Sequence, residues 1–511
     1  MDISLRSQER GSPRQLLDPR RSALGTLELG LLLVSGAIFL AWALLAAVHV
    51  DDRYQLDHVG GARMALARYF NGGVLYPPLV GDGTYGGTRF MPVPIVLHGA
   101  LARITGEYLV SGKVLGYVAM IMLLIAMVVL LVRMRCRLPV AVALAASVLT
   151  THTGLAAGMD LRADALPLLL QLLAIALVAE TSGRGATVGA AALSATAVLS
   201  KSSAVWAPLA IAVWLLMVDR RRLGWFLVAY GALVGVLLAF FGAATNGRFF
   251  LNVFGLSTAG VQGPGSLLRG PYFLLHLLVE QAMAAWALLP IAAAGLWLAR
   301  AERRVSLYQL SLVCCLGVLV VVLSDVGTGW NQLVDLVVLT ALVVGELAGR
   351  SWPEAWPRGA ITVPLVVLVL WVNLTGLVVT LVPDARQALG QLRAGHPAAG
   401  RPLAGRATSS TPLLSEDPYV PVALDQTPTV LDPFMLLRIG REDPAAVQQL
   451  VGRINRRDFT FVVLVEPLEP LDREWWRQLH FGPEVVQALA GSYEYTGRDQ
   501  GYYIYEPSPR R

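Results

Sequence analysis

Residues 28–49 read ELGLLLVSGAIFLAWALLAAVH, a run that contains one acidic side chain, Glu28, and no lysine or arginine. As a helix rising 1.5 Å per residue, the run is long enough to cross the hydrocarbon core of a bilayer, about 30 Å thick. The whole chain of 511 residues is also strongly apolar, with 55% apolar residues, 15% charged residues and a mean hydropathy of +0.58. Soluble domains carry about 25% charge. A soluble single domain, a disordered chain and a secreted disulfide scaffold are therefore excluded.

Further apolar runs predict an α-helical polytopic membrane protein with eleven transmembrane helices, and their continuity excludes an alternating β-barrel pattern. The predicted spans are 28–49, 110–132, 139–157, 164–181, 186–200, 203–218, 223–243, 272–298, 306–324, 331–348 and 360–381. Residues 90–105 are short, contain two prolines and carry His98 and Arg103, so we expect an interfacial helix there.

Basic residues predict the sidedness of the chain. With eleven spans, seventeen arginines fall on one side: Arg6, Arg10, Arg14, Arg20, Arg21, Arg133, Arg135, Arg137, Arg184, Arg220, Arg221, Arg222, Arg300, Arg303, Arg304, Arg350 and Arg358. Because basic loops stay cytoplasmic, we expect a multi-pass protein of the plasma membrane with its N-terminus inside. The net charge of +6 comes from arginines in short loops, which orient the protein in the membrane. We therefore predict no nucleic-acid partner.

The resulting domain organisation has four parts: a cytoplasmic segment 1–27, a transmembrane domain 28–381 with a large outer loop 50–109, a linker 382–413 and an extracytoplasmic α/β domain 414–511. Within the last part we expect strands at Val420–Leu424, Phe459–Val465 and Gly501–Tyr505. Helical patterns cover Pro444–Asn455, Trp475–Leu479 and Pro483–Ala490. The three cysteines suggest neither a structural disulfide nor a thiolate metal site.

Acidic side chains open the first outer loop. Asp51, Asp52 and Asp57 lie within one or two helical turns of the predicted membrane surface, and Asp57 begins an amphipathic helix that ends at Asn71-Gly72-Gly73. Two interpretations of Asp57 stay open on local evidence: a helix N-cap, or a functional carboxylate at the positive end of a helix.

Other polar residues lie near the same face. A very short loop contains Asp160, Arg162 and Asp164. These residues form either a helix N-cap with a local Asp/Arg pair, or a polar cluster that binds a phosphate or a metal. Lys201 either snorkels or contacts a phosphate. The pairs His276/Glu280 and Asn331/Asp335 have i, i+4 spacing at span ends; we favour an inward structural pair for His276 and Glu280 over a ligand role.

These motifs resemble those of the C-type (GT-C) membrane glycosyltransferases, a group that includes protein O-mannosyltransferases and the lipid A aminoarabinose transferase. The similar elements are Asp57, the helix from Ala65 to Gly72 followed by Tyr76-Pro77-Pro78, Arg162 with Asp164, Ser200-Lys201, and Gly327 to Asn331. The appended C-terminal domain is similar as well. Where the family commonly has Asp-Glu, this chain has Asp57-His58.

The resemblance implies an inverting glycosyltransferase that moves a sugar from a polyprenyl-phosphate donor to a lipid, glycan or protein acceptor. Asp57 is the implied base, with Asp51 or Asp52 second. Arg162 and Lys201 are implied for the phosphate, and Asp164 and Asn331 for shaping the pocket. No cofactor is assigned with certainty, and a divalent metal stays open. The alternatives are a membrane transporter or lipid flippase, expected to have internal repeats and broken helices, and a non-catalytic scaffold.

Overall fold

A computed structural model describes residues 19–81, 83–162, 164–255, 264–325, 327–350, 358–393 and 402–509. Two expectations fall partly outside these residues: the N-terminal segment up to residue 18 and the middle of the linker.

The transmembrane part is a bundle of apolar helices. Among the described residues, six segments are long and apolar enough to cross a membrane. They are α1 (Pro19–Val48), α4 (Tyr108–Arg133), α10 (Arg220–Ala244), α13 (Met283–Ala301), Trp330–Ala348 with η4 (Trp330–Leu333) and α15 (Val334–Ala348), and Thr362–Arg393 within α16 (Arg358–Gly376), η5 (Leu377–Leu381) and α17 (Val382–Arg393). The predicted polytopic helical protein is confirmed, while the count of eleven stays a prediction.

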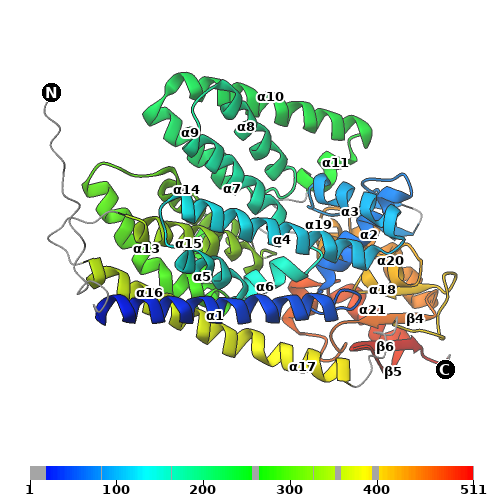
Figure 1. The fold of residues 1–511 in the computed structure, drawn as a ribbon. Coiled ribbons are helices and arrows are strands. Elements are labelled where there is room, and N and C mark those ends of the chain that lie inside the picture. Colours follow the sequence, from blue (N-terminus) through cyan, green and yellow to red (C-terminus); the bar gives the residue numbers. More distant parts are fainter. Residues whose placement is uncertain are drawn as a thin grey trace, which may run out of the picture.

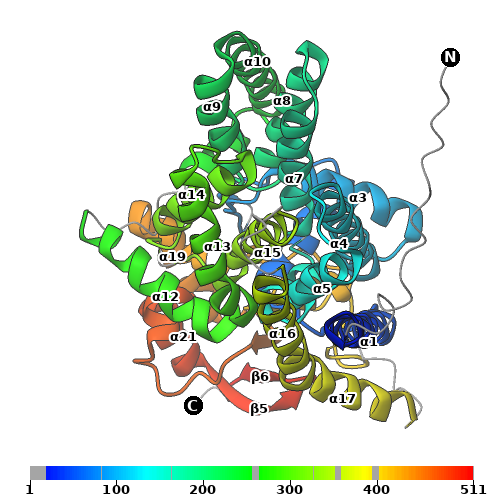
Figure 2. The same ribbon diagram turned by 60° about the vertical axis from the view of Figure 1, so that its left-hand side comes forward.

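Shorter helices occupy other predicted spans: α7 (Ala165–Glu180), α8 (Arg184–Val198), α9 (Trp206–Val218) and α14 (Leu307–Val322). Short elements follow α10, namely α11 (Arg248–Phe250), η2 (Leu251–Gly255) and η3 (Pro264–Leu268). In Figure 2, α15 lies at the centre of the bundle, surrounded by α4, α5, α13, α14 and α16. Its near-complete burial agrees with that position.

The span predicted at 139–157 is broken. It forms α5 (Leu138–Leu149) and α6 (His152–Met159), which are bent by 79°. The hydroxyls of Thr150 and Thr151 donate to carbonyls of the preceding turn, and Thr151 also caps α6 by accepting from the N–H of Gly154 at 3.0 Å. Side-chain bonds therefore replace the helix bonds that are lost at the bend.

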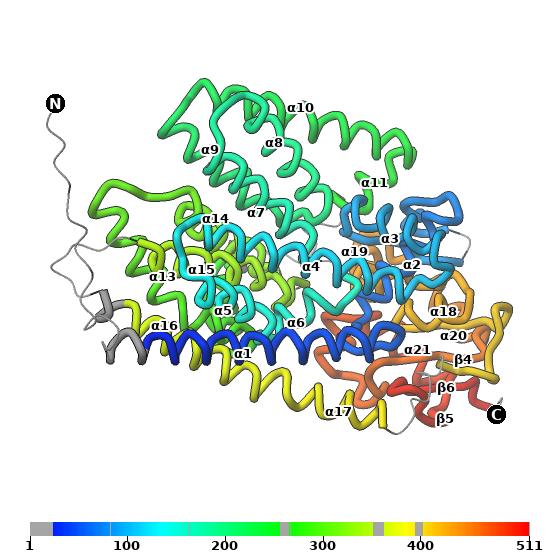
Figure 3. The backbone as a smooth tube through the Cα atoms, in the orientation of Figure 1, coloured from blue at the N-terminus to red at the C-terminus, as the bar shows by residue number. Residues whose placement is uncertain are grey.

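The span predicted at 272–298 is also two helices, α12 (Arg269–Gln281) and α13, separated at Ala282. Ala282 has φ −135° and ψ 48°, outside the helical region, so the backbone bonding is interrupted there. The predicted linker needs correction too, because its first twelve positions are helical in α17 and continue the preceding helix. Figure 3 shows this path running beside α1 toward the C-terminal domain.

The first outer loop contains two helices and a small hairpin. Helix α2 (His58–Asn71) and helix α3 (Pro92–Thr105) form where the sequence predicts helices, while an interfacial position of α3 stays a prediction. Strands β1 (Val80–Gly81) and β2 (Thr84–Tyr85) pair antiparallel between them.

The C-terminal domain contains a four-stranded sheet of order β3-β4-β6-β5. Its strands are β3 (Leu413–Ser415), β4 (Phe461–Leu464), β5 (Tyr493–Asp499) and β6 (Tyr502–Pro507); β3 runs parallel to β4, and the other pairs are antiparallel. Its helices are α18 (Tyr419–Ala423), α19 (Pro433–Glu442), α20 (Pro444–Arg456), η6 (Trp475–Leu479) and α21 (Pro483–Ser492).

One expected strand of this domain is wrong. Residues 420–424 lie in and directly after helix α18. The side chain of Asp417 accepts a hydrogen bond from the N–H of Tyr419 at 2.9 Å, and Pro421 lacks the N–H that a strand ladder requires. The turn at Asp417 thus overrides the β-type composition of the run.

The basic loops gather at one end of the bundle. Arg137 pairs with Glu28 at 2.7 Å, Arg133 with Glu180, and Arg350 with Glu302. Figure 1 shows α2, α3 and the C-terminal domain at the opposite end. The two sets of loops separated by the sequence analysis are therefore separated in space.

The first turn of α2 is packed between the bundle and the C-terminal domain. A Cβ added at Gly60 would lie 2.7 Å from an Asp160 carboxylate oxygen, and one added at Gly61 would lie 2.2 Å from Asp417 Oδ1. Both positions therefore require glycine. The first outer loop and the C-terminal domain also share a hydrophobic core, with Leu66 and Tyr76 from one and Val420 and Ile504 from the other.

Gly61→Ala should loosen this packing, because the new methyl group meets Asp417 and the backbone N of Tyr419. Overpacking costs about 1–3 kcal/mol, so we expect a lower unfolding temperature and faster proteolysis between residues 402 and 412. Gly36→Ala in α1 is the matched control, because a Cβ there meets nothing within 4 Å. Equal behaviour of the two variants would contradict the packing described.

Candidate active site

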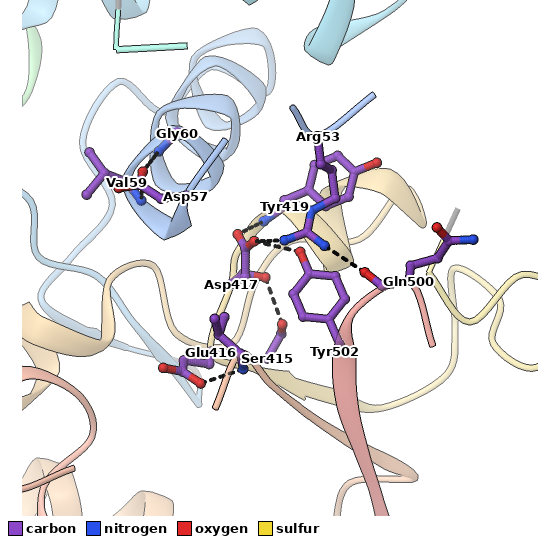
Figure 4. Close-up of polar contacts among 11 residues, drawn as sticks. Arg53, Asp57, Val59, Gly60, Ser415, Glu416, Asp417, Tyr419, Gln500 and Tyr502 are labelled. Atoms are coloured by element: carbon purple, nitrogen blue, oxygen red, sulfur yellow. Dashed lines mark hydrogen bonds and ion pairs between the residues drawn. The ribbon is translucent and has the colours of Figure 1, made fainter. Parts of the chain in front are cut away.

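Asp57 is the N-cap of α2, and its Oδ1 accepts hydrogen bonds from the N–H groups of Val59 at 3.0 Å and Gly60 at 3.1 Å (Figure 4). Its Oδ2 accepts from Arg162. The Asp57 side chain is 41% exposed. The N-cap interpretation is therefore correct, and the same carboxylate stays accessible.

Arg162 joins two carboxylates. It lies in the loop between α6 and α7, contacts Asp57 through Nη2, and places Nε 2.7 Å from Asp160 Oδ2. Asp160 is buried and accepts from the backbone N–H of Leu161 at 2.6 Å. The loop 160–164 thus links the bundle to the first turn of α2.

Asp160 has an unusual protonation equilibrium. Burial and the nearby negative charge of Asp164 raise the pKa of Asp160 to about 8, although Arg63 and the Leu161 N–H act in the opposite direction. At neutral pH the protonated form is therefore well populated.

Asp164 is the centre of a second set of contacts. One oxygen lies 2.9 Å from Lys201 Nζ, and the other accepts from Asn331 Nδ2 at 2.9 Å. These residues come from the start of α7, the turn after α8 and η4. Asp335 lies deeper and accepts from Trp206 Nε1 at 3.2 Å. We name Asp57, Asp160, Arg162, Asp164, Lys201 and Asn331 the polar cluster.

Arg63 was missed by the sequence analysis. It is buried in the middle of α2, donates to the backbone carbonyl of Arg162, and is close enough to Asp160 and Asp164 to interact with both charges. In an amphipathic helix such an arginine is expected to face water. The available signal was the double glycine before it, since Gly60-Gly61 marks a close backbone approach.

Asp51 and Asp52 make different contacts. Asp51 is exposed. Asp52 lies 2.5 Å from His49 Nδ1, accepts from the N–H of Tyr54 at 2.8 Å, and lies 3.6 Å from Lys113 Nζ. Burial alone would raise the pKa of Asp52, but these hydrogen bonds and charges hold it below its usual value. Asp52 is thereby engaged in a structural network.

Lys113 is the second residue that the sequence analysis missed. Its Nζ is buried and donates to the carbonyls of His49 at 2.6 Å and Tyr54 at 3.1 Å. It thus fixes the exit of the chain from α1. A lysine at the start of an apolar run was the available signal, because such residues are rarely unpaired.

His276 and Glu280 lie outside the cluster. They pair at 3.4 Å on α12, as their spacing predicts, but both side chains are about half exposed. The expected inward orientation is therefore wrong, since α12 is separated from α13 and presents this face outward.

A metal does not fit the cluster well. Asp57 already accepts from two N–H groups and an arginine, and the neighbouring His58 ring packs against His480 with ring centroids 4.4 Å apart. No group of three or more His, Cys, Asp or Glu side chains suited to an ion occurs among the described residues. No chemical step is assigned to a metal here.

The C-terminal domain contacts the loop that carries Asp57 (Figure 4). Arg53 lies 3.4 Å from Asp417 Oδ2 and donates to the Gln500 carbonyl at 3.0 Å, and the Tyr502 hydroxyl donates to the same Asp417 oxygen at 2.6 Å. Burial raises the pKa of Asp417, although Arg53 and Tyr502 oppose this. A buried acid paired across the interface holds the two parts together.

Comparisons with known proteins show which solved structures have a similar fold. No protein-family model and no curated protein matches the chain. Among solved structures, ArnT from Cupriavidus metallidurans bound to undecaprenyl phosphate is similar over 93% of this chain and 97% of that one, with 13% identity and a TM-score of 0.59. The apo state of ArnT gives a TM-score of 0.56 at 13% identity, over 95% and 98% of the two chains.

The archaeal oligosaccharyltransferase AglB from Archaeoglobus fulgidus, in complex with an inhibitory peptide and a dolichol-phosphate, is similar over 93% of this chain and 74% of that one. The identity is 12% and the TM-score 0.50. At these identities the likeness concerns the fold. The resemblance to GT-C membrane glycosyltransferases is confirmed at that level.

Asp160→Asn should flatten the pH dependence of stability. The pKa of Asp160 is near the ordinary aspartate value of 3.8 in the unfolded chain and about 8 in the folded protein, so between these values the folded protein keeps a proton that the unfolded chain releases. Stability from this group is complete below pH 4 and falls by up to about 1.4 kcal/mol per pH unit as the pH rises toward 8.

The measurement is the unfolding temperature of both proteins in detergent at pH 5 and pH 8. Wild type should lose more than the asparagine variant, which has no proton to release. An equal loss would contradict the assignment.

Proposed function

We propose that this chain is an inverting glycosyltransferase that moves a sugar from a polyprenyl-phosphate-linked donor to an acceptor hydroxyl at the outer face of the membrane. The observation that carries the proposal is the exposed Asp57 carboxylate at the edge of the polar cluster. Its side chain is 41% exposed, whereas those of Asp160 and Asp164 are 3% and 1% exposed. Support comes from the shared fold, since the ArnT and AglB structures hold undecaprenyl phosphate and dolichol-phosphate.

Asp57 is suited to act as the general base. A carboxylate has about four acceptor positions, and Asp57 uses three of them for Val59, Gly60 and Arg162. The remaining position would accept the proton of the acceptor hydroxyl as its oxygen attacks the sugar. The bond from the sugar to the phosphate breaks, and the lipid phosphate leaves with the bonding electrons. No acid is needed, because phosphate is a stable leaving group.

Arg162 and Lys201 are the proposed phosphate contacts. Both are held by acidic side chains, Arg162 by Asp57 and Asp160 and Lys201 by Asp164, so their positions are fixed before a ligand binds. Preorganised cations stabilise charge that develops on a leaving group. Asn331, bonded to Asp164, would shape the pocket from η4.

No observation favours a transporter or flippase. The sequence analysis expected broken helices for that class, and the bend between α5 and α6 is such a break. A broken helix therefore does not by itself distinguish a transporter from a transferase. The charged residues of the polar cluster nevertheless lie at helix ends and in loops, where lipid-borne substrates meet water.

The proposed topology has eleven spans, with the N-terminus in the cytoplasm and the C-terminal domain outside the plasma membrane. In a variant without the three native cysteines, a cysteine at Gly405 should react with a membrane-impermeant reagent in intact cells. A cysteine at Arg303, exposed at the other end of the bundle, is the control and should react only after permeabilisation. The opposite pattern would invert the topology.

Asp57→Asn tests the base directly. Asparagine caps a helix about as well as aspartate but cannot take a proton. The variant should express and unfold normally while release of polyprenyl phosphate falls by about 10²–10⁴-fold, the usual contribution of a positioned base. The readout is lipid phosphate released from a panel of polyprenyl-phosphate sugars.

Asp219→Asn is the matched control. Asp219 caps α10 through the N–H groups of Arg221 and Arg222, at the basic end of the bundle. It should therefore keep activity. Normal activity of Asp57→Asn together with an inactive, well-folded Asp51→Asn or Asp52→Asn would move the base upstream.

A further inference from the structure

A cavity of about 430 Å³ lies where the C-terminal half of α2 meets the C-terminal domain, away from the polar cluster. Its walls include Arg68, Tyr69 and Asn71 of α2, Tyr108 at the start of α4, and Thr427 with Pro428 from the C-terminal domain. The volume falls within the range of small-molecule sites, about 300–1,000 Å³.

The walls are fixed on both sides. Arg68 donates to Asp425 Oδ1 at 3.2 Å and to the Asp425 carbonyl at 2.6 Å, which anchors the chain before Thr427. After Pro428, the Tyr85 N–H donates to the Thr429 carbonyl at 2.7 Å. The cavity is therefore formed jointly by the first outer loop and the C-terminal domain, and neither part makes it alone.

The lining has a mixed chemistry. Two tyrosines offer apolar ring faces together with hydroxyls, Asn71 donates from Nδ2 to the Tyr108 hydroxyl at 3.2 Å, and Arg68 stays partly exposed. Sugars combine apolar C–H faces with many hydroxyls, so aromatic rings beside amide and guanidinium groups are complementary to them. A purely apolar ligand would use none of the hydrogen-bonding positions that Arg68, Asn71 and the tyrosine hydroxyls keep beyond these contacts.

We infer that this cavity is a carbohydrate-binding subsite, and that it holds a remote part of the acceptor. The second half of the inference rests on the proposed function. Twelve residues of α2 separate Asp57 from Tyr69, or about 18 Å of helix. One sugar ring does not bridge that distance, so the acceptor is a glycan of several units, free or as a lipid headgroup.

The test measures saccharide binding in the absence of donor. Purified full-length protein is titrated calorimetrically with short linear oligosaccharides of glucose, mannose and galactose, and then with the best ligand linked to a lipid in nanodiscs. At least one saccharide should bind saturably. Tighter binding of the lipid-linked form would identify a glycolipid headgroup, and equal binding a free glycan.

Thr427→Trp should fill the cavity and weaken binding more than about tenfold, a change of 1.4 kcal/mol. Tyr69→Ala, which removes part of the opposite wall, should also weaken saccharide binding. It tests the cavity if Thr427→Trp does not fold. Gln449→Trp, on the exposed face of α20, is the matched control and should bind normally.

Absence of binding by every saccharide, or equal binding by wild type and both cavity variants, would overturn the inference. Release of lipid phosphate by wild type is measured separately. Saccharide binding without any donor turnover would therefore overturn the proposed function and keep the subsite.

Discussion

The first turn of α2 is confined between two buried carboxylates, and the architecture of the outer end depends on this constraint. Asp160 approaches Gly60 from the helix bundle, and Asp417 approaches Gly61 from the C-terminal domain. A side chain at either glycine would push one of these acids away. Because Asp57 begins the same helix, its carboxylate is aimed by contacts that originate in three separate parts of the chain.

Much of the fold follows from local patterns. Apolar runs predict the helices of the bundle, and Asp57 with Asn71-Gly72-Gly73 predicts both ends of α2. The bend between α5 and α6 was missed, because the threonines that replace helix bonds there look like ordinary residues of an apolar span. The helix α18 was missed because the capping bond of Asp417 overrides a β-type composition.

The residues of the polar cluster could be predicted from the sequence only in part. Asp57, Arg162, Asp164, Lys201 and Asn331 stood out as polar residues at span ends, and the structure connects them. Arg63 and Lys113 were not recognised, since burial of a charge depends on partners elsewhere in the chain. The contact of Arg53 with Asp417 joins residues 364 positions apart, and no local pattern indicates it.

The shared core of the first outer loop and the C-terminal domain has a consequence for biogenesis. During synthesis the loop is made early, while the strands and helices of the C-terminal domain that pack against Leu66 and Tyr76 are made last. Until then the part of this core that Val420 and Ile504 complete stays open, and exposed apolar surfaces attract chaperones and proteases. The shared core is therefore complete only when the last residues of the polypeptide have been made and folded.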